Sequence, residues 1–333
     1  MLQFLKKATL FLFSLLTALI FLSCERNSPT EIIDDGIPPT APIGLSVFRQ
    51  YDGEVGIEWI SNLEKDIKFY KIFRSISNEN NFAVIDSTSS TYFLDVGLEY
   101  DSTYYYKIKA VDLFGYESDF SAYVSAVPQN LYPPYPPYYL SINARNWNDS
   151  LSMKITFGNS FSTDVKHYEI HRSLNPNFSP DNSSLIGVTN ELSFIDKNHL
   201  DLLVDYYYKI ISVDKGNLQS QPSVEVRDFL LDKPIQISPE NNASVDYFAE
   251  FKIQTCSKPA DYRIVVQANE IYGPLTEINF SSNEINKIIT VPIKNITFAA
   301  YADYYWRVFT YTKGNNIPNS FSKLQKFTII PGG

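Results

Sequence analysis

Tyr104-Tyr105-Tyr106-Lys107-Ile108 decides the fold of this chain, because the chain contains closely similar stretches in two further places. They are Tyr206-Tyr207-Tyr208-Lys209-Ile210 and Tyr304-Tyr305-Trp306-Arg307-Val308. Upstream of each copy lies an aromatic residue that is followed eleven positions later by a tyrosine; the pairs are Trp59 and Tyr70, Phe157 and Tyr168, and Phe251 and Tyr262. The copies start about 100 residues apart, which predicts tandem domains rather than a solenoid of short repeats.

Each repeat is made of short segments in which apolar and other residues alternate. Val55, Ile57 and Trp59 are separated by glutamate or glycine, the period-two pattern of a strand with one buried face. Seven such segments, separated by turn residues and without helical periodicity, fill residues 38–128. The 24 tyrosines and 23 phenylalanines of the chain also favour strands. The pattern therefore predicts an all-β chain of β-sandwiches.

These landmarks resemble those of the fibronectin type III family, over residues 38–330. In that family the second strand carries a tryptophan, the third a tyrosine, and the sixth a tyrosine that follows a leucine by six residues. The matching residues of the first repeat are Trp59, Tyr70, Tyr104 and Leu98. The resemblance implies three tandem fibronectin type III-like (immunoglobulin-like) sandwiches. It also implies that Tyr104, Tyr206 and Tyr304 form tyrosine corners, with the ring buried and the hydroxyl bonded to nearby backbone.

The repeats also predict where the domains lie. The three domains are expected over residues 38–128, 138–229 and 233–331. In the second, Phe157 takes the place of the tryptophan and keeps an aromatic ring in the core. The third is divergent, because it lacks the Arg-Ser pair that the first two carry at residues 74–75 and 172–173.

A proline-rich linker is expected at residues 129–137, between the first two domains. Pairs of prolines alternate with tyrosines from Tyr132 onward, and such pairs favour the stiff polyproline II conformation. The segment is therefore predicted to be a spacer. The alternative is a docking ligand for an aromatic-lined groove.

The first residues of the chain have the pattern of a targeting segment. Lys6 and Lys7 precede an apolar run of fifteen residues, from Ala8 to Leu22, which suits a signal peptide and is short for a membrane span. The run ends in Leu22-Ser23-Cys24, which resembles the bacterial lipobox. The resemblance implies a lipoprotein signal peptide at residues 1–23 that is cleaved before Cys24, and acyl chains on Cys24. The alternative is an ordinary secretory leader with a chance cysteine.

Residues 24–37 are expected to form a disordered tether, since they are polar and acidic without apolar periodicity. Acyl chains on Cys24 would then anchor the chain to a membrane of the bacterial cell envelope. Glu25, rather than aspartate, follows that cysteine, which favours the outer membrane by the sorting rule of enterobacteria.

Charge and cysteine content exclude several classes of protein. The chain has 28 basic and 37 acidic residues, and no basic patch, which argues against a nucleic-acid partner. A disulfide framework is excluded because Cys24 and Cys256 are the two cysteines. We expect Cys256 to be a small, partly buried hydrophobe.

The sequence contains no recognisable catalytic or metal-binding motif. His167 and His171 lie on a predicted strand, on one face but ~13 Å apart, too far to share a metal ion. Acidic residues that recur between repeats, such as Asp95 and Asp196, are interpreted as turn residues of the fold. We therefore predict no catalytic residues, no metal, no cofactor and no enzymatic activity.

Tyr105, Tyr207 and Tyr305 are candidate surface residues, because they face outward on the sixth strand of each repeat. Exposed aromatic rings can stack on sugars or anchor protein partners. The alternative is that neighbouring strands cover them, since aromatic pairs stabilise sheets without any ligand.

Together these features predict a non-catalytic, lipid-anchored envelope protein whose tandem sandwiches serve as binding, adhesion or spacer modules. Its partners would be the membrane, through Cys24, and a protein or a glycan of unknown identity. One alternative is a carbohydrate-binding surface lipoprotein of a glycan-uptake system. Another is an accessory subunit of an envelope or secretion assembly. The adhesive role is a fold-level analogy.

Overall fold

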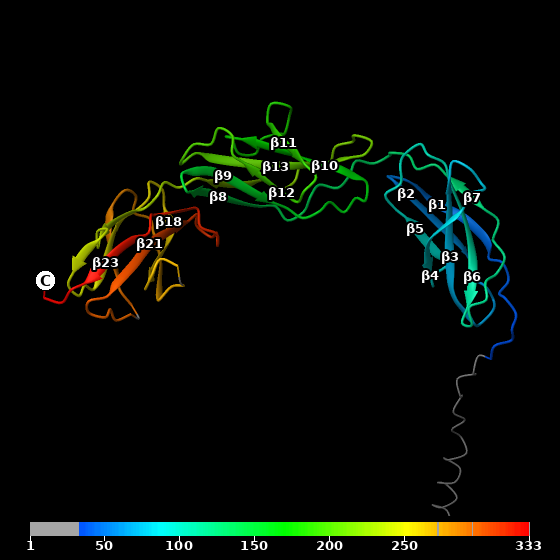
Figure 1. Cartoon of the computed structure of the whole chain (residues 1–333). Helices are drawn as coiled ribbons and strands as arrows, with labels where there is room; N and C mark the ends of the chain where they lie inside the picture. The colour runs from blue at the N-terminus through cyan, green and yellow to red at the C-terminus, as the bar shows by residue number, and fades with distance from the viewer. Residues whose placement is uncertain (1–32, 272, 295, 333) are drawn as a thin grey trace, which may run out of the picture. The chain divides into compact units, whose positions relative to one another are not determined.

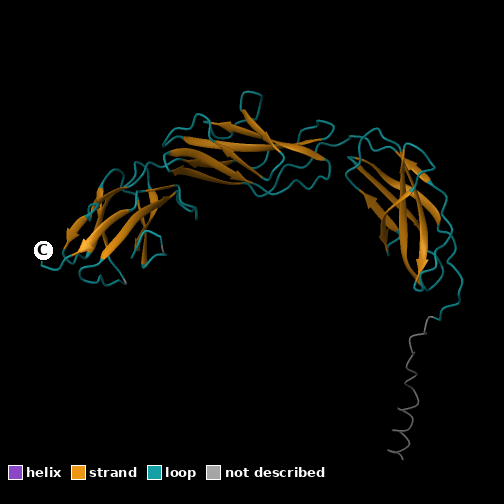
Figure 2. Ribbon diagram, viewed as in Figure 1, coloured by secondary structure: helices purple, strands orange, loops and turns teal. Residues whose placement is uncertain are grey.

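A computed structural model of the chain describes residues 33–332, apart from residues 272 and 295. The expected signal peptide at 1–23, Cys24 and most of the tether lie outside the described residues. The described chain is built of strands joined by turns and loops (Figures 1 and 2). The predicted all-β class is confirmed. In this part of the chain we find no helix with the length and apolar character that a membrane span needs.

The first sandwich contains strands β1 to β7 (Figure 1). Their bounds are β1 Ile43–Tyr51, β2 Glu54–Ile60, β3 Ile67–Ile76, β4 Ala83–Thr88, β5 Tyr92–Asp95, β6 Tyr104–Asp112 and β7 Val124–Ala126. One sheet has the order β1-β2-β5 and the other the order β4-β3-β6-β7. A fibronectin type III-like sandwich has the same division into a three-stranded and a four-stranded sheet. The expected fold of this domain is therefore confirmed.

The second sandwich repeats this arrangement. Its strands are β8 Ser141–Trp147, β9 Ser150–Thr156, β10 Val165–Ser173, β11 Leu185–Thr189, β12 Ser193–Asp196, β13 Asp205–Asp214 and β14 Val226–Phe229. The order β12-β9-β8 corresponds to the three-stranded sheet of the first sandwich. The order β11-β10-β13-β14 corresponds to its four-stranded sheet.

The third sandwich has the same plan with two additional pairings. Its strands are β15 Ile235–Ser238, β16 Ala243–Val245, β17 Glu250–Gln254, β18 Ala260–Gln267, β19 Thr276–Ser282, β20 Ile288–Pro292, β21 Asp303–Tyr311, β22 Ser320–Phe321 and β23 Gln325–Ile329. One sheet has the order β15-β17-β20, and β22-β21-β18-β19 belong to the other. β16 pairs in parallel with β23, which pairs with β21.

An aromatic pair bridges the two sheets in the first and second sandwiches. Trp59 lies edge-on to Tyr70, with ring centroids 5.2 Å apart, and Phe157 lies edge-on to Tyr168 at 4.9 Å. The indole Nε1 of Trp59 is buried and has no hydrogen-bond partner in the described part of the chain. Phenylalanine can therefore replace this tryptophan without the loss of a hydrogen bond.

A buried Arg–Asp–Tyr cluster occurs in the first sandwich and again in the second. Asp95 accepts hydrogen bonds from Arg74 at 2.8 Å and from the Tyr106 hydroxyl at 2.7 Å. The second sandwich contains the same cluster, formed by Arg172, Asp196 and Tyr208. Burial opposes the charge on Arg74 and Arg172, but the aspartate beside each raises its pKa above the usual value. Each cluster ties the two sheets together with a paired charge.

Aromatic packing replaces this cluster in the third sandwich. Trp306 stands where the other repeats have Tyr106 and Tyr208, and its ring centroid lies 4.7 Å from that of Phe251. Phe298 and Phe327 contact each other at 5.5 Å in the same core. The third sequence repeat is divergent because an apolar core needs neither the arginine nor the aspartate.

The described chain divides into two compact units. The first consists of the first sandwich without the segments Tyr51–Glu54 and Val96–Tyr100. The second consists of these segments and residues 129–333, which include both of the other sandwiches. Within the second unit, β22 pairs in parallel with β8, so that one sheet runs through the second and third sandwiches.

Asn319 is the centre of a buried polar junction between the second and third sandwiches. Its Nδ2 donates to the carbonyl of Phe229 at 2.7 Å and its Oδ1 accepts from the amide of Leu231 at 2.8 Å. Its own carbonyl accepts from the amide of Asn146 at 2.7 Å. The side chain therefore satisfies backbone groups of the interdomain segment that have lost access to water.

Asp228 completes this junction. Its carboxylate accepts hydrogen bonds at 2.8 Å from the Ala144 amide, the Phe229 amide and the Thr312 hydroxyl. Burial raises the pKa of Asp228, although these three donors oppose the effect. The two sandwiches are therefore joined by a satisfied buried network in addition to the covalent linker.

Asn319→Ala should destabilise the second unit by about 2–4 kcal/mol, because it leaves the carbonyl of Phe229 and the amide of Leu231 buried without partners. Urea unfolding of the full chain would measure this loss. Asn182→Ala, at an exposed asparagine of the same unit, should change the free energy of unfolding by less than about 0.5 kcal/mol. Equal effects of the two substitutions would contradict the role assigned to Asn319.

In the first unit, Glu64 forms hydrogen bonds with Thr40, in the segment that precedes β1. Its Oε1 accepts hydrogen bonds from the amide of Thr40 at 2.8 Å and from the hydroxyl of Thr40 at 2.7 Å. Burial by itself would raise the pKa of Glu64, but the hydrogen bonds from Thr40 and Asn62 outweigh it and lower the pKa from 4.5 to about 2.

This depressed pKa predicts how the contact depends on pH. A carboxylate with a folded-state pKa below its unfolded value contributes stability above pH 4.5, and the contribution is lost as the pH falls towards about 2. The protection factor of the Thr40 amide, which compares its exchange rate with that of an unfolded chain at the same pH, should therefore remain constant down to pH 4 and fall near pH 2. Glu64→Gln should remove this pH dependence. A transition centred above pH 4 in the unsubstituted chain would contradict the assignment.

Candidate binding surface

The tyrosines expected at the corners are buried in all three sandwiches. The hydroxyl of Tyr206 accepts a hydrogen bond from the amide of Asp201 at 2.8 Å, and that of Tyr304 accepts one from the amide of Ala299 at 2.7 Å. The ring of Tyr104 is covered by the guanidinium of Arg74, 5.7 Å from its centroid. These side chains therefore serve the fold.

Tyr206→Phe should destabilise its sandwich by about 1–3 kcal/mol, because the Asp201 amide loses its acceptor. Tyr207→Phe is the matched control, since the neighbouring Tyr207 faces outward and its hydroxyl has no hydrogen-bond partner among the described residues. Thermal unfolding of the two variants should separate them, with Tyr207→Phe close to the unsubstituted chain. Identical midpoints would remove the corner assignment.

The three candidate surface tyrosines lie half-buried on separate sandwiches. Tyr105 packs edge-on against Tyr123, with ring centroids 5.8 Å apart. Tyr207 lies across from Ser173 and Arg227 in the sheet. Tyr305 lies across from Gln267 and Lys326. The structure does not bring these three rings together into one site.

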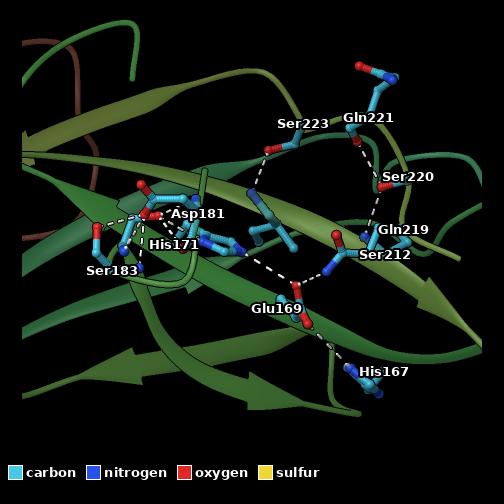
Figure 3. A network of polar contacts seen from close by, with 12 residues as sticks. His167, Glu169, His171, Asp181, Ser183, Ser212, Gln219, Ser220, Gln221 and Ser223 are labelled. Atoms are coloured by element: carbon cyan, nitrogen blue, oxygen red, sulfur yellow. Dashed lines mark hydrogen bonds and ion pairs between the residues drawn. The ribbon is translucent and has the colours of Figure 1, made fainter. Parts of the chain in front are cut away.

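The two histidines of β10 belong to a polar network around Glu169 (Figure 3). Their Nε2 atoms lie 3.9 Å (His167) and 3.6 Å (His171) from its carboxylate oxygens, and Gln219 donates to this carboxylate at 2.8 Å. His171 Nδ1 is within hydrogen-bond distance of the Ser184 hydroxyl, at 3.0 Å. The described residues include no group of three or more histidines, cysteines or acidic residues placed to hold a metal ion.

A site that the sequence did not predict lies on the outer face of the third sandwich, over β19, β18 and β21. In one cross-strand row, Asn279, Arg263 and Phe309 are direct neighbours. In the next row, Val265 lies between Glu277 and Arg307. Because side chains alternate along a strand, these residues point away from the core that contains Tyr262 and Trp306.

Two adjoining clefts are hollowed into this face. One has a volume of about 400 Å³ and is lined by Arg307, Phe309 and Glu277, among others. The other has a volume of about 510 Å³ and contains Asn279 and Ser281 in its lining. Both are bordered by three further residues, Arg263, Tyr311 and Asn316. The face thus combines two arginines, aromatic rings and side-chain amides with three acidic residues, Asp261, Glu270 and Glu277.

Arg307 is the distinctive residue of this surface. Its guanidinium lies 5.8 Å from the centroid of Phe309 and 6.0 Å from that of Phe321, and it forms no hydrogen bond or ion pair with the residues that the structure describes. Burial lowers its pKa, in contrast to Arg74 and Arg172, whose pKa values are raised by an aspartate. A half-buried cation of this kind can accept an anionic partner.

Arg263 and Tyr311 add further donors to the same face. Arg263 lies over the ring of Tyr311, 5.2 Å from its centroid, and its NH1 contacts Glu277 at 3.5 Å. The Nε of Arg263 is buried without an acceptor in the described part of the chain. The hydroxyl of Tyr311 likewise has no partner among the described residues, and burial raises its pKa. The hydroxyl of Tyr311 can therefore donate a hydrogen bond to a ligand in the clefts, whereas the buried Nε of Arg263 cannot reach one.

One feature of the sequence marks this site. Arg307 occupies the position of Lys107 and Lys209 in the repeated stretch. Lys107 lies between the rings of Phe82 and Phe120, at 4.0 and 3.7 Å from their centroids. Lys209 donates to the carbonyl of Phe178 and contacts Glu225 at 3.6 Å. A cation recurs at this position. Like Arg307, Lys107 has no hydrogen-bond or ion-pair acceptor among the described residues, but Lys107 lies between two rings whereas Arg307 borders a cleft.

Comparison with known proteins finds no matching family model and no matching curated protein. Among solved structures, one that resembles the chain is the crystal structure of chicken CNTN1 FN1-FN3 domains, with 14% sequence identity and a TM-score of 0.38. The match covers 88% of this chain and 100% of that one. A second, entitled "Myokine structure", has 21% identity and a TM-score of 0.24, and covers 27% of this chain and 98% of that one.

Proposed function

We propose that the chain is a non-catalytic, lipid-anchored protein of the bacterial cell envelope that binds a ligand through its third sandwich. The observation that carries the binding role is the cleft in which Arg307 has no acceptor among the described residues. The hydroxyl of Tyr311, which borders the same cleft, adds a donor with no partner among the described residues. Unused donors in a cleft are characteristic of a binding site rather than of a sealed structural surface.

The proposed anchor is supported by the sequence at the start of the chain. An apolar leader, the lipobox-like Leu22-Ser23-Cys24 and an acidic, polar tether follow one another. Acyl chains on Cys24 would place the protein on a membrane of the envelope, with the outer membrane favoured by Glu25. The tether would then separate the first sandwich from the bilayer.

A spacer role for the second sandwich is supported by the junction around Asn319 and Asp228. Because the buried hydrogen bonds of these residues join it to the third sandwich, the second sandwich can support the binding face. The non-catalytic role rests on the sequence, which contains no recognisable catalytic motif.

Cys24→Ala tests the anchor. Bacteria that express the full chain should incorporate a labelled fatty acid into it, and the substitution should abolish the labelling and release the protein from the membrane fraction. Cys256→Ala is the matched control and should leave the labelling unchanged. Cys256 is fully buried, and burial, with help from Asp232, raises the pKa of its thiol to about 12. Labelling that persists in Cys24→Ala would contradict the proposal.

A further inference from the structure

We propose that the clefts over β18 and β21 bind an acidic saccharide, with Arg307 as the counter-charge of a uronate carboxylate. This inference rests on the proposed binding function and names its ligand class, but it is independent of the lipid anchor. The ligand would lie along the outer face of the third sandwich, between the Arg307 end of one cleft and the Asn279 end of the other.

The carboxylate is inferred from the state of Arg307. The guanidinium carbon lies 5.8 Å from the ring centroid of Phe309 and 6.0 Å from that of Phe321. No described residue accepts a hydrogen bond from its N–H groups. A planar guanidinium pairs most strongly with a carboxylate, through two parallel hydrogen bonds. Partial burial strengthens such a pair compared with one in open water. The N–H groups of Arg307 therefore present a preformed site for one carboxylate.

The saccharide is inferred from the groups around this arginine. Phe309 lies on the same face of β21 as Arg307, two residues further along the strand, and its half-buried ring offers an aromatic surface that a sugar ring can contact. Tyr311, four residues along, is buried beneath Arg263 and contributes its hydroxyl rather than its ring. The exposed amides of Asn279 and Asn316 form no side-chain hydrogen bond within the described chain. Amides both donate and accept, as the hydroxyl groups of a sugar require.

An acidic peptide fits this surface less well. Peptides that bind to sheets gain most of their main-chain hydrogen bonds by adding a strand to an open edge. β18 is paired with β19 and β21, and β21 is paired with β18, β22 and β23, so that the free edge of this sheet is β19. A peptide added to β19 would lie three strand spacings, ~14 Å, from β21, beyond the reach of Arg307. A ligand here must be recognised by side chains alone, which suits a polyhydroxylated chain better than a polypeptide.

The acidic residues of the cleft limit the charge density of the ligand. Glu277 contacts Arg263 at 3.5 Å, Glu270 also borders the first cleft, and Asp261 borders the second. A densely charged polyanion would bring its groups close to these carboxylates and be repelled. One carboxylate per sugar ring, as in a uronate, can reach Arg307 while the rest of the ring contacts neutral groups.

The test is binding of oligosaccharides to the full chain, purified in detergent, by isothermal titration calorimetry. The probes are oligomers of galacturonate, glucuronate and mannuronate, a neutral galactose oligomer of equal length and a polyglutamate peptide. We expect at least one uronate oligomer to bind at least about tenfold more tightly than the neutral oligomer and the peptide, with an affinity that falls as salt is raised.

Arg307→Gln should weaken uronate binding by at least about tenfold and remove the preference for the acidic oligomer. Arg307→Lys, which keeps the charge and loses the bidentate geometry, should lie between Arg307→Gln and the unsubstituted chain. Arg227→Gln removes an exposed arginine from the second sandwich, outside the clefts, and should leave affinity unchanged. Thermal unfolding of all three variants verifies that each is folded.

Three outcomes would overturn the inference. The first is that none of the uronate oligomers binds to the unsubstituted chain. The second is that the polyglutamate peptide binds as tightly as the best uronate oligomer, which would assign the surface to acidic protein segments. The third is that Arg307→Gln and Arg227→Gln affect binding equally. None of these results changes the expected acyl labelling at Cys24, so failure of the ligand class is distinguishable from failure of the anchor.

Discussion

The alternation of side chains along the sixth strand of each sandwich is the constraint on which the rest of the structure depends. In β6, β13 and β21 every second side chain enters the core, and the others face outward. The inward set supplies the buried tyrosines and Trp306. The outward set supplies Tyr305, Arg307 and Phe309. A shift of one residue in the register would move the charged side chains into the core, so folding and the proposed binding face are specified by the same few residues.

The three copies stabilise this strand by two different physical means. In the first two sandwiches a tyrosine hydroxyl and an arginine share one buried aspartate, which requires every partner to be present. In the third, rings fill the same region, and the indole Nε1 of Trp306 is left without a partner among the described residues. An apolar core tolerates substitution by other apolar side chains of similar volume, whereas a buried hydrogen-bonded charge requires its specific partners. This difference accounts for a third sequence that departs from the first two while its strand order remains the same.

Much of the fold could be predicted from the sequence, because period-two patterns and aromatic landmarks are local signals. The strand that begins at Tyr104 and its two copies were identified from a few residues each. The junction could not be predicted in this way, because Asn319 meets Phe229 and Leu231 across about ninety residues of chain. The candidate binding surface was missed for a related reason. Whether a basic residue such as Arg307 has an acceptor depends on neighbouring strands, while its position in the motif reveals only that it faces outward.

The shared sheet and buried junction have a consequence for how such a protein can evolve. Tandem sandwiches are usually treated as modules that recombination can copy, delete or exchange one at a time. A recombination point between the second and third sandwiches would separate Asp228 from the hydroxyl of Thr312 and Asn319 from the carbonyl of Phe229. The heritable module in this region is therefore a pair of sandwiches, and gene rearrangements that retain both members should be the ones that selection tolerates.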